Sequence, residues 1–546
     1  MSDRILYLCE KPSQSRTLAK LLGADKFEDG AYLNEDTIVT NAHGHLLSLA
    51  MPDKYIGEGK WKLDDLPILP IEWIWTVNEK NSPQFETIRH WLSKADHVVI
   101  ASDPDDEGEV LARQLLSAHQ FKGKVSRMWT SALNPDALSH SLKNLLPLSA
   151  TDSYYRAGLM RRMLDWLYGM NLSRGYSVKF DRTVHIGRVK TRLLHELVKR
   201  DQEIDAFKSN TYHKVITSVG NSELEYMGNS ARKLNIDEQV ELMSLSDSTG
   251  MCVSDDFGVE QLLPPLPYTL SALLADAANM GISLANGYQS VQHLYELGAV
   301  SYPRTGCTSM PGHGKAGFAT HSAIVITGEL PTIASSDMAL IYNLINQNVL
   351  ANEAGAATVH RRLRQFEFGT HVFQLSEKWA DSKKAGFIPL VANNSIPALE
   401  EYGALLNGRS SVAIREGEPV ELREIWIEEH RTVQPEWYDE ATLLTMMAKN
   451  NIGTEATRVE AINSLTRNKV AVSLTQMDDY EHELGLPNVI KPTQWGKWLH
   501  ASLHPSVTSQ HMVDHVSAAT EAARRGDINL NQHFLIATQW LVKVIK

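Results

Sequence analysis

The sequence is poor in cysteine and lacks long hydrophobic runs. Its 546 residues include three cysteines, Cys9, Cys252 and Cys307, and no Cys-x-x-Cys pair. This spacing excludes a disulfide framework and a zinc ribbon, and it favours a reducing, cytoplasmic setting. No run of eighteen apolar residues and no basic segment followed by an apolar one are present. We therefore expect neither a membrane span nor a signal peptide.

The chain also lacks an excess of positive charge, with a net charge of −12. Taken as a whole, this charge argues mildly against a nucleic-acid partner. Residues 151–200, however, hold eleven Lys or Arg against four acids, a local charge of +7. Phosphate contacts act locally, because charges are screened beyond about 10 Å. Charge alone leaves two readings open: a DNA or RNA site, or solvated helix faces.

Composition and length indicate a folded protein of several domains, with 43% apolar and 22% charged residues. Residues 5–9 form an apolar run typical of a strand buried on both faces. Glu10 and Lys11 follow it, and Ser13 is expected to cap a helix over residues 14–22. Ligands bind at such strand ends in open α/β sheets, so Glu10 and Lys11 are candidates for chemistry. The alternative is a simple ion pair.

A second strand is predicted over residues 97–101, after a helix over 85–94, and it runs into five carboxylates within seven residues. They are Asp103, Asp105, Asp106, Glu107 and Glu109. Packed carboxylates repel one another unless a cation neutralises them, and the oxygens of Asp103, Asp105 and Glu107 suit Mg²⁺. The alternative is an acidic turn that caps the helix predicted over 110–118. A third strand, predicted over 124–130, completes a βαβαβ pattern and hence a parallel sheet.

A third candidate segment is Ser301-Tyr302-Pro303-Arg304-Thr305, predicted to lie in a short strand. Side chains two apart on a strand share a face, so Tyr302 and Arg304 can address the same phosphate. A tyrosine nucleophile beside an anion-binding arginine is a plausible pair, although Tyr-x-Arg also occurs by chance.

A strand ending in Glu10, followed by a strand ending in Asp103-x-Asp105-x-x-Gly108, resembles the Toprim fold. Residues 41–46 (Asn-Ala-His-Gly-His-Leu), 66–70 and 129–133 are similar to type IA DNA topoisomerases of the bacterial or plasmid topoisomerase III branch. The resemblance implies a multi-domain α/β plus α+β protein. An N-terminal Toprim domain would combine with helical, winged-helix-like and β-arch domains to form a toroid. The expected segments are 1–150 (Toprim), 151–208 and 431–546 (helical DNA groove), 209–262 and 331–430 (arch), and 263–330 (tyrosine lobe).

The resemblance also implies residues that contact DNA. Residues 161–174 are similar to the family's Arg…Asp-Trp-Leu-x-Gly-x-Asn segment, and residues 187–191 to its Gly-Arg-Val-Gln-Thr motif. Further matches are a His-x-Ala-Ile segment at 321 and Gly-Thr-x-Ala-Thr-Arg at 453–458. The implied DNA-binding residues are Arg161, Arg162, Asp165, Arg174, Arg188, Lys190, His321, Thr457 and Arg458.

The implied reaction is the cleavage, passage and religation of single-stranded or negatively supercoiled DNA by a monomer. Tyr302 would form a 5′-phosphotyrosyl link, which conserves the bond energy, and no P-loop motif for ATP is present. Arg304, Lys11 and Mg²⁺ would offset the charge of the transition state, and Glu10 would protonate the departing 3′-oxygen. Cationic surroundings are expected to lower the pKa of Tyr302.

Four features depart from the family pattern. Asp106 stands where arginine is common, and Gly306 stands where an acid is common. The segment from Tyr302 to His321 is short, and the cysteine-bearing zinc modules of many relatives are missing. These departures motivate one alternative, a catalytically weak or silent DNA-binding relative. Another is a Toprim nuclease or primase, which would leave Tyr302 unexplained.

Overall fold

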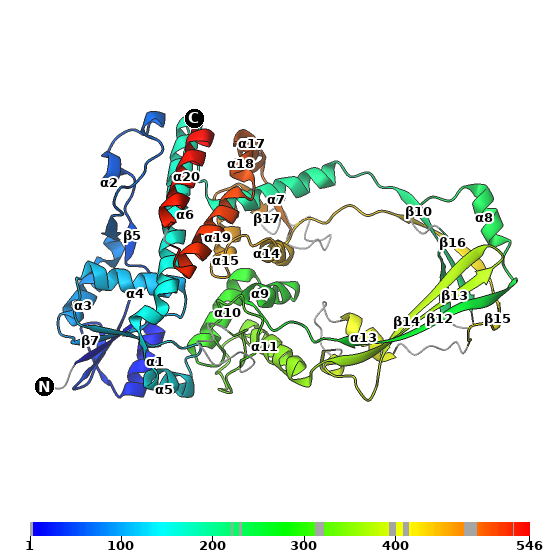
Figure 1. Ribbon diagram of the computed structural model, residues 1–546, viewed down its shortest axis with the longest axis horizontal. Helices are drawn as coiled ribbons and strands as arrows, with labels where there is room; N and C mark the ends of the chain where they lie inside the picture. The colour runs from blue at the N-terminus through cyan, green and yellow to red at the C-terminus, as the bar shows by residue number, and fades with distance from the viewer. Residues whose placement is uncertain are drawn as a thin grey trace.

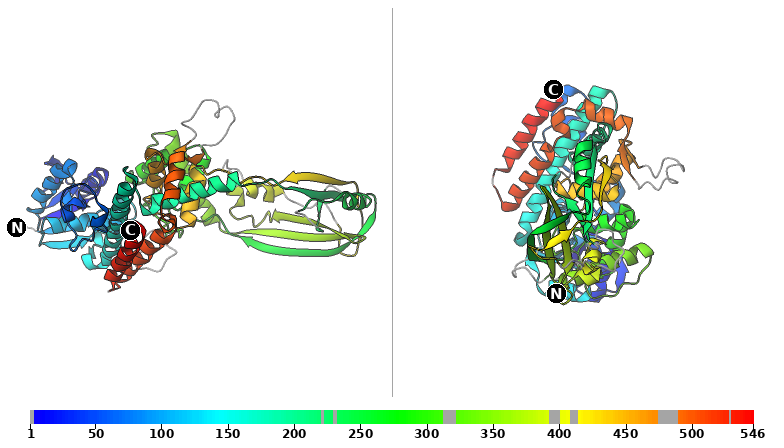
Figure 2. Two further views of the ribbon diagram at one scale, coloured as in Figure 1. Left: turned by 90° about the horizontal axis from the view of Figure 1, so that it is seen from above. Right: turned by 90° about the vertical axis from the view of Figure 1, so that its right-hand side faces the viewer.

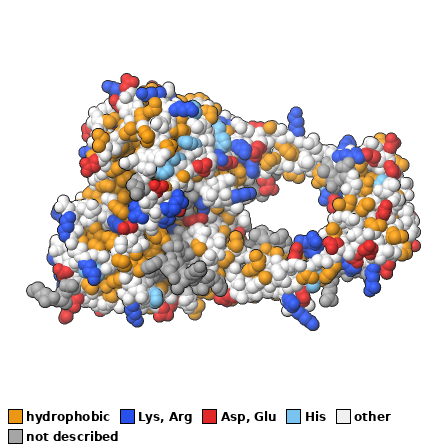
Figure 3. All heavy atoms as spheres, viewed as in Figure 1, with side chains coloured by type: hydrophobic (Ala, Val, Ile, Leu, Met, Phe, Trp, Pro, Cys, Tyr) orange, Lys and Arg blue, Asp and Glu red, His pale blue; other side chains and the backbone are white. Residues whose placement is uncertain are grey.

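The computed structural model describes residues 4–219, 222–228, 232–311, 322–391, 400–407, 414–473, 489–527 and 529–546. A mixed body holds both termini, and two arms connect it to a β-rich arch (Figure 1). Body and arch lie end to end along the long axis (Figure 2). The space-filling view shows an open hole between them (Figure 3), so the predicted toroid is confirmed.

The N-terminal domain is built on a seven-stranded sheet in the order β2-β3-β4-β1-β7-β8-β9. Its centre is parallel, as predicted: β4 (Thr37–Asn41), β1 (Ile5–Cys9), β7 (His97–Ala101) and β8 (Lys124–Arg127). The outer strands pair antiparallel: β2 (Lys26–Glu28), β3 (Ala31–Leu33) and β9 (Leu146–Pro147). Helices α1 (Pro12–Leu22), α3 (Ser82–Leu92), α4 (Asp106–Ala118) and α5 (Pro135–Lys143) connect them. Smaller elements are α2 (Asp53–Ile56), β5 (Leu47–Leu49) and β6 (Trp75–Val77).

Two helix starts differ from the sequence prediction. Helix α1 begins at Pro12, whose fixed φ suits the first helical position, so Lys11 is the N-cap and the prediction of Ser13 as cap is wrong. Helix α4 begins at Asp106 rather than at Val110, because the Asp105 carboxylate caps it by accepting a hydrogen bond from the Gly108 amide. The acidic segment therefore continues into the first turn of α4.

The helical part of the body is centred on α6 (Asp152–Phe180), which packs against α4, α19 (His511–Arg525) and α20 (Leu530–Ile545). Helix α7 (Arg188–Asp205) contacts α15 and leads into the upper arm (Figure 1). The remaining elements are α14 (Glu440–Lys449), α15 (Arg458–Arg467), β17 (Ala471–Ser473), β18 (Ile490–Pro492), α17 (Gln494–Ser502) and α18 (Pro505–Thr508). No helix in the described ranges is both long and apolar enough to cross a membrane.

The segment that carries Tyr302 follows α9 (Leu270–Asn279) and α10 (Leu284–Glu296). Helix α9 packs on α14 of the helical part. Helix α11 (Ser336–Ala354) packs on α9 and α10, although the sequence analysis assigned residues 331–430 to the arch. The three helices share one apolar core that includes Leu273, Leu294 and Ile345.

The arch is an antiparallel sheet in the order β15-β12-β13-β14-β11-β10-β16. Residues 357–380 form a hairpin in which the chain turns at Gly369, with φ of 61°. The strands are β10 (Thr211–Val219), β11 (Ser222–Tyr226), β12 (Thr249–Leu262), β13 (Ala357–Phe368), β14 (His371–Ala380), β15 (Pro419–Glu421) and β16 (Ile425–Arg431). The arch helices are α8 (Ile236–Met243), α12 (Ile388–Val391) and α13 (Glu400–Asn407).

Candidate active site

The site forms where β1 and β7 end side by side. These strands pair in parallel with Cys9 opposite Ala101, so the residues that follow them lie together. Lys11 Nζ lies 3.0 Å from Asp103 Oδ2, and Gln14 Nε2 donates a hydrogen bond to Asp103 Oδ1. Two of the segments singled out in the sequence therefore meet although 92 residues separate them.

Tyr302 reaches the acidic segment from the neighbouring lobe. Its hydroxyl donates a hydrogen bond to Asp105 Oδ2 at 2.6 Å, and its amide donates to the Ser131 carbonyl at 2.6 Å. The Tyr302 ring packs edge-on against Tyr295, with centroids 5.5 Å apart. The predicted strand is wrong: Tyr302 lies in an irregular segment after a single bridge between Val300 and Ile326. The side chain is placed by contacts with the N-terminal domain and not by a strand.

Arg304 lies beside the same carboxylates. Its Nη1 is 3.9 Å from Asp103 Oδ2, a distance that leaves the guanidinium only loosely paired. Its Nε is buried and has no hydrogen-bond partner in the described part of the chain. A buried donor without a partner is unfavourable, so this geometry suits an incoming anion.

The carboxylates dominate the electrostatics of the site. Burial raises the pKa of Tyr302 well above its usual value, and Asp105 and Asp103 raise it further while Arg304 opposes them. The expectation of a lowered pKa is therefore wrong, because burial and the two carboxylates outweigh the effect of Arg304. Burial, together with Asp103, raises the pKa of Glu10 to about 8.

The same charge bears on the predicted metal site. Burial and the nearby Asp103 raise the pKa of Asp105, a sign of negative charge that lacks full compensation. Mg²⁺ takes one or two carboxylates and completes its shell with phosphate oxygens and water, so Asp103 and Asp105 fit this ion. The described residues contain no preformed group of three potential ligands around one point.

Glu107, the third predicted metal ligand, forms ion pairs with Arg162 and His45. Its carboxylate lies 2.5 Å from Arg162 Nη2 and 3.2 Å from His45 Nε2. Although burial acts in the opposite direction, His45 and Arg162 lower the pKa of Glu107 to about 2. A metal ion held by Glu107 would have to compete with Arg162.

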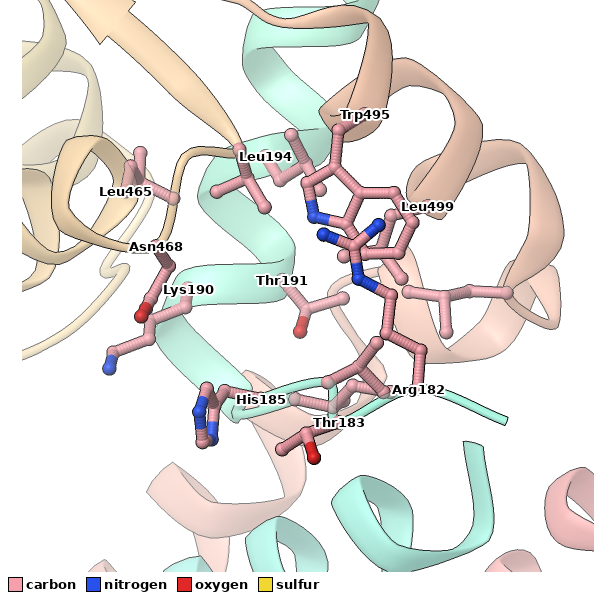
Figure 4. A pocket seen from close by; sticks show the side chains of 14 residues that line it. Arg182, Thr183, His185, Lys190, Thr191, Leu194, Leu465, Asn468, Trp495 and Leu499 are labelled. Atoms are coloured by element: carbon pink, nitrogen blue, oxygen red, sulfur yellow. The ribbon is translucent and has the colours of Figure 1, made fainter. Parts of the chain in front are cut away.

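The residues predicted to bind DNA fall into two groups. Several extend from the acidic segment along α6 and into α7, where they form ion pairs: Arg161 with Asp106 (2.8 Å), Arg188 with Asp165 (2.8 Å) and Arg174 with Asp53 (2.7 Å). Lys190 lines a cavity between α7, α15 and α17, where Arg182 lies over the indole of Trp495 at 3.9 Å (Figure 4). Their role in DNA binding stays a prediction.

The second group lies at the junction of α9 and α15. Arg458 is buried, pairs with Glu455 at 2.5 Å and donates to Ser271 Oγ at 2.8 Å. Thr457 Oγ1 accepts a hydrogen bond from the Thr454 amide at 2.9 Å. Arg458 thus joins two helices rather than facing open solvent. His321 lies outside the described residues.

Several residues of the site were missed in the sequence. Arg127 is fully buried and donates to the carbonyls of Ser102 (2.9 Å) and Asp103 (2.7 Å), which fixes the end of β7. A charged residue at the end of an apolar strand was a signal for it. Gln14 and Tyr295 carried no such signal, because both lie within ordinary helical patterns.

Comparisons with known proteins agree with this geometry. A family model described as "DNA topoisomerase" matches residues 149–320 and 312–477, and a "Toprim domain" model matches residues 5–133. The chain is 25% identical to "DNA topoisomerase 3" of Staphylococcus haemolyticus, over 95% of this chain and 81% of that protein. It is 27% identical to "DNA topoisomerase 3" of Staphylococcus aureus strain USA300, over 84% of this chain and 72% of that protein.

A solved structure gives the same fold. Full-length topoisomerase I from Thermotoga maritima matches 99% of this chain and 90% of its own, with a TM-score of 0.79 and 19% identity. The matched family models together cover most of the chain and include both the acidic segment and Tyr302. The chain therefore belongs to the type IA DNA topoisomerases, with relatives named DNA topoisomerase 3, and it carries the metal-binding Toprim domain of that family.

Proposed function

We propose that this protein cleaves single-stranded DNA through Tyr302, passes a strand through the break and religates it without ATP. One observation supports this most strongly: the Tyr302 hydroxyl lies 2.6 Å from Asp105 Oδ2, in the same site as Lys11 and Arg304. A nucleophile, its nearest base and two cations thus share one site. This is the constellation that phosphoryl transfer to a tyrosine requires.

The scissile phosphate would bind between Arg304 and Lys11. The unpartnered Nε of Arg304 offers one donor, and Lys11, 3.0 Å from Asp103, supplies a second positive charge. Tyr302 Oη forms the new bond to phosphorus while the bond from phosphorus to the 3′-oxygen breaks. The tyrosine proton passes to the Asp105 carboxylate, which already accepts its hydrogen bond.

The departing 3′-oxygen takes a proton from the Glu10 carboxyl group. With a pKa of about 8, raised by burial and by Asp103, Glu10 holds that proton at neutral pH. Religation runs the same transfers in reverse. Asp103 and Asp105 would hold Mg²⁺, which supplies positive charge for the phosphate when bound.

The hole between body and arch would hold the passed strand after it has crossed the break (Figure 3). To admit it, the lobe that carries Tyr302 must part from the N-terminal domain, to which polar contacts hold it. These include the bonds of Tyr302 to Asp105 and Ser131. The substrates we propose are negatively supercoiled or catenated DNA, acted on by a monomer in the cytoplasm.

The test is to incubate the protein with Mg²⁺ and single-stranded DNA, denature it, and look for protein covalently attached to DNA. We expect adducts with the wild-type protein and none with Tyr302→Phe. Free cleaved DNA that persists in Tyr302→Phe would identify a Toprim nuclease instead. DNA binding without cleavage would identify a silent relative.

A further inference from the structure

Asp106 lies at the centre of an ion cluster that joins three helices. Arg161 Nη2 on α6 lies 2.8 Å from Asp106 Oδ2, and Arg524 Nη2 on α19 donates to both Asp106 oxygens at 2.8 Å. The Asp106 side chain is 10% exposed. Two guanidinium groups thus share one carboxylate, and the cluster of these three side chains carries a net positive charge.

This cluster opens onto the active site. A cavity of about 470 Å³ is lined by Asp105, Glu107 and Arg304 of the active site and also by Arg161 and Arg524. Gly306 also lines it, and a β-carbon there would approach Glu455 Oε1 to 3.6 Å. Because Gly306 has no side chain, it adds no side-chain atoms to the cavity lining between Arg304 and Glu455.

Two of the carboxylates that line the cavity, Glu107 and Glu455, have other cations as partners, and Asp105 accepts the hydrogen bond of the Tyr302 hydroxyl. Glu107 pairs with Arg162, and Glu455 pairs with Arg458, both at 2.5 Å. Glu521 lies 3.8 Å from Arg524 Nε but is 54% exposed, so water screens that pair. The charge of Arg161 and Arg524 that Asp106 does not offset therefore remains available to a ligand.

Arg524 also keeps donors for such a ligand. A guanidinium group has five N–H donors, and in the described chain both hydrogen bonds of Arg524 to Asp106 come from Nη2. The guanidinium lies over the Tyr154 ring at 5.0 Å, and the side chain is 31% exposed. Asp106 and Tyr154 thus hold Arg524 at the cavity, and the hydrogen bonds to Asp106 do not use Nη1.

We propose that Arg524, held by Asp106 at the wall of the active-site cavity, binds a phosphate of the single strand next to the scissile one. This inference rests on the proposed function, because it requires that the cavity receives single-stranded DNA. Arg524 is a positioning residue: it orients the strand and does not touch the reacting atoms. Helix α19, the last but one in the chain, thereby becomes part of the DNA site.

The test measures binding of a single-stranded oligothymidylate by fluorescence anisotropy, in EDTA, from about 50 to 200 mM salt. Removing one phosphate contact lowers the slope of log K against log salt by about 0.7 for a single strand. We expect this loss in Arg524→Gln, with roughly tenfold weaker binding. Arg525→Gln is the matched control, since Arg525 is the next residue on α19 and is 66% exposed.

Two further variants separate DNA binding from a purely structural role. Arg524→Lys keeps the charge and is expected to keep the salt slope. Asp106→Asn removes the anchor of Arg524 but keeps both arginines, so we expect it to weaken binding less than Arg524→Gln does. If Arg524→Gln lowers only the melting temperature and keeps the slope, Arg524 is a structural clamp and the proposal is wrong. If the wild-type protein binds no single strand, the proposed function itself fails.

Discussion

At the residue scale, the site is defined by carboxylates whose negative charge is only partly offset by nearby cations. Glu10, Asp103 and Asp105 lie at the ends of two paired strands, with Lys11 and Arg304 as the nearest cations. In this state Tyr302 is protonated, because burial and two carboxylates raise its pKa. A bound cation and a phosphate at Arg304 would have to change this balance before Tyr302 can react.

The raised pKa of Glu10 predicts a pH dependence of stability in EDTA. Its pKa is about 8 in the folded protein and about 4.3 in an unfolded chain. Between these values the folded state binds more protons, so stability falls as pH rises from about 4.3 to 8 and levels off above it. The slope reaches at most about 1.4 kcal/mol per pH unit.

The measurement compares the thermal unfolding of the wild-type protein with that of Glu10→Gln over this pH range. The wild-type curve should decline more steeply, and the two should run parallel above pH 8. Parallel curves throughout the range would show that Glu10 titrates normally.

Mg²⁺ is expected to raise the melting temperature, because Asp103 and Asp105 carry uncompensated charge. At 100 times its Kd, the ion would add about 2.7 kcal/mol to the free energy of unfolding. Asp105→Asn should lose most of this gain, whereas Asp256→Asn, an exposed carboxylate of the arch, should keep it. An equal gain in all three proteins would place the ion elsewhere.

At the element scale, buried ion pairs join helices that are distant in sequence. Arg458 on α15 meets Glu455 and the start of α9 through Ser271, and Arg127 fixes the end of β7. These arginines make several hydrogen bonds each, so their loss leaves buried partners unsatisfied. They determine how the elements of the body fit together.

Arg458→Ala should therefore lower the free energy of unfolding by about 3–5 kcal/mol, because the largely buried Glu455 carboxylate loses its cation and keeps only its hydrogen bonds from Ser271. Arg467→Ala is the control: its pair with Glu460 is exposed and contributes at most about 1 kcal/mol. Denaturant unfolding of both variants gives the comparison. Equal effects would mean that the α9–α15 junction opens to solvent in solution.

At the scale of the whole molecule, strand passage requires α9 and the Tyr302 segment to leave the body while the arch keeps the chain connected (Figure 1). Polar contacts between helices help to hold the closed form. In the described chain they include Arg458 of α15 with Ser271 of α9, and the Leu284 amide of α10 with Glu440 of α14, both at 2.8 Å. The balance between closed and open forms depends on these bonds.

Ser271→Ala removes one of these contacts without touching the cleavage site. We expect cleavage of a short single strand to stay unchanged and the ratio of decatenation to cleavage to rise severalfold, since opening becomes easier. Gel assays of both reactions on one preparation give this ratio. A proportional fall in both activities would point instead to a damaged fold.

Much of the N-terminal domain was predictable from the sequence. The strands 5–9 and 97–101 have the predicted bounds, because buried parallel strands are continuous apolar runs with charged residues at their ends. The toroid and the family followed from motifs that recur in a fixed order. The prediction of a short strand at Tyr302 is wrong, because the conformation there depends on the contact with Ser131, which is distant in sequence.

The sequence by itself determined the chemical groups of the site: a tyrosine, carboxylates at strand ends and a basic segment between them. Only the tertiary structure decided how they act on one another. Tyr302 meets Asp105 across 197 residues, and Arg524 meets Asp106 across 418. Local patterns carry no record of such contacts, and the pKa of a buried group depends on neighbours that only folding supplies. The carboxylate of Asp106 is thus paired with Arg161 and Arg524. The pKa of Tyr302 is raised, so its activation requires bound ligands.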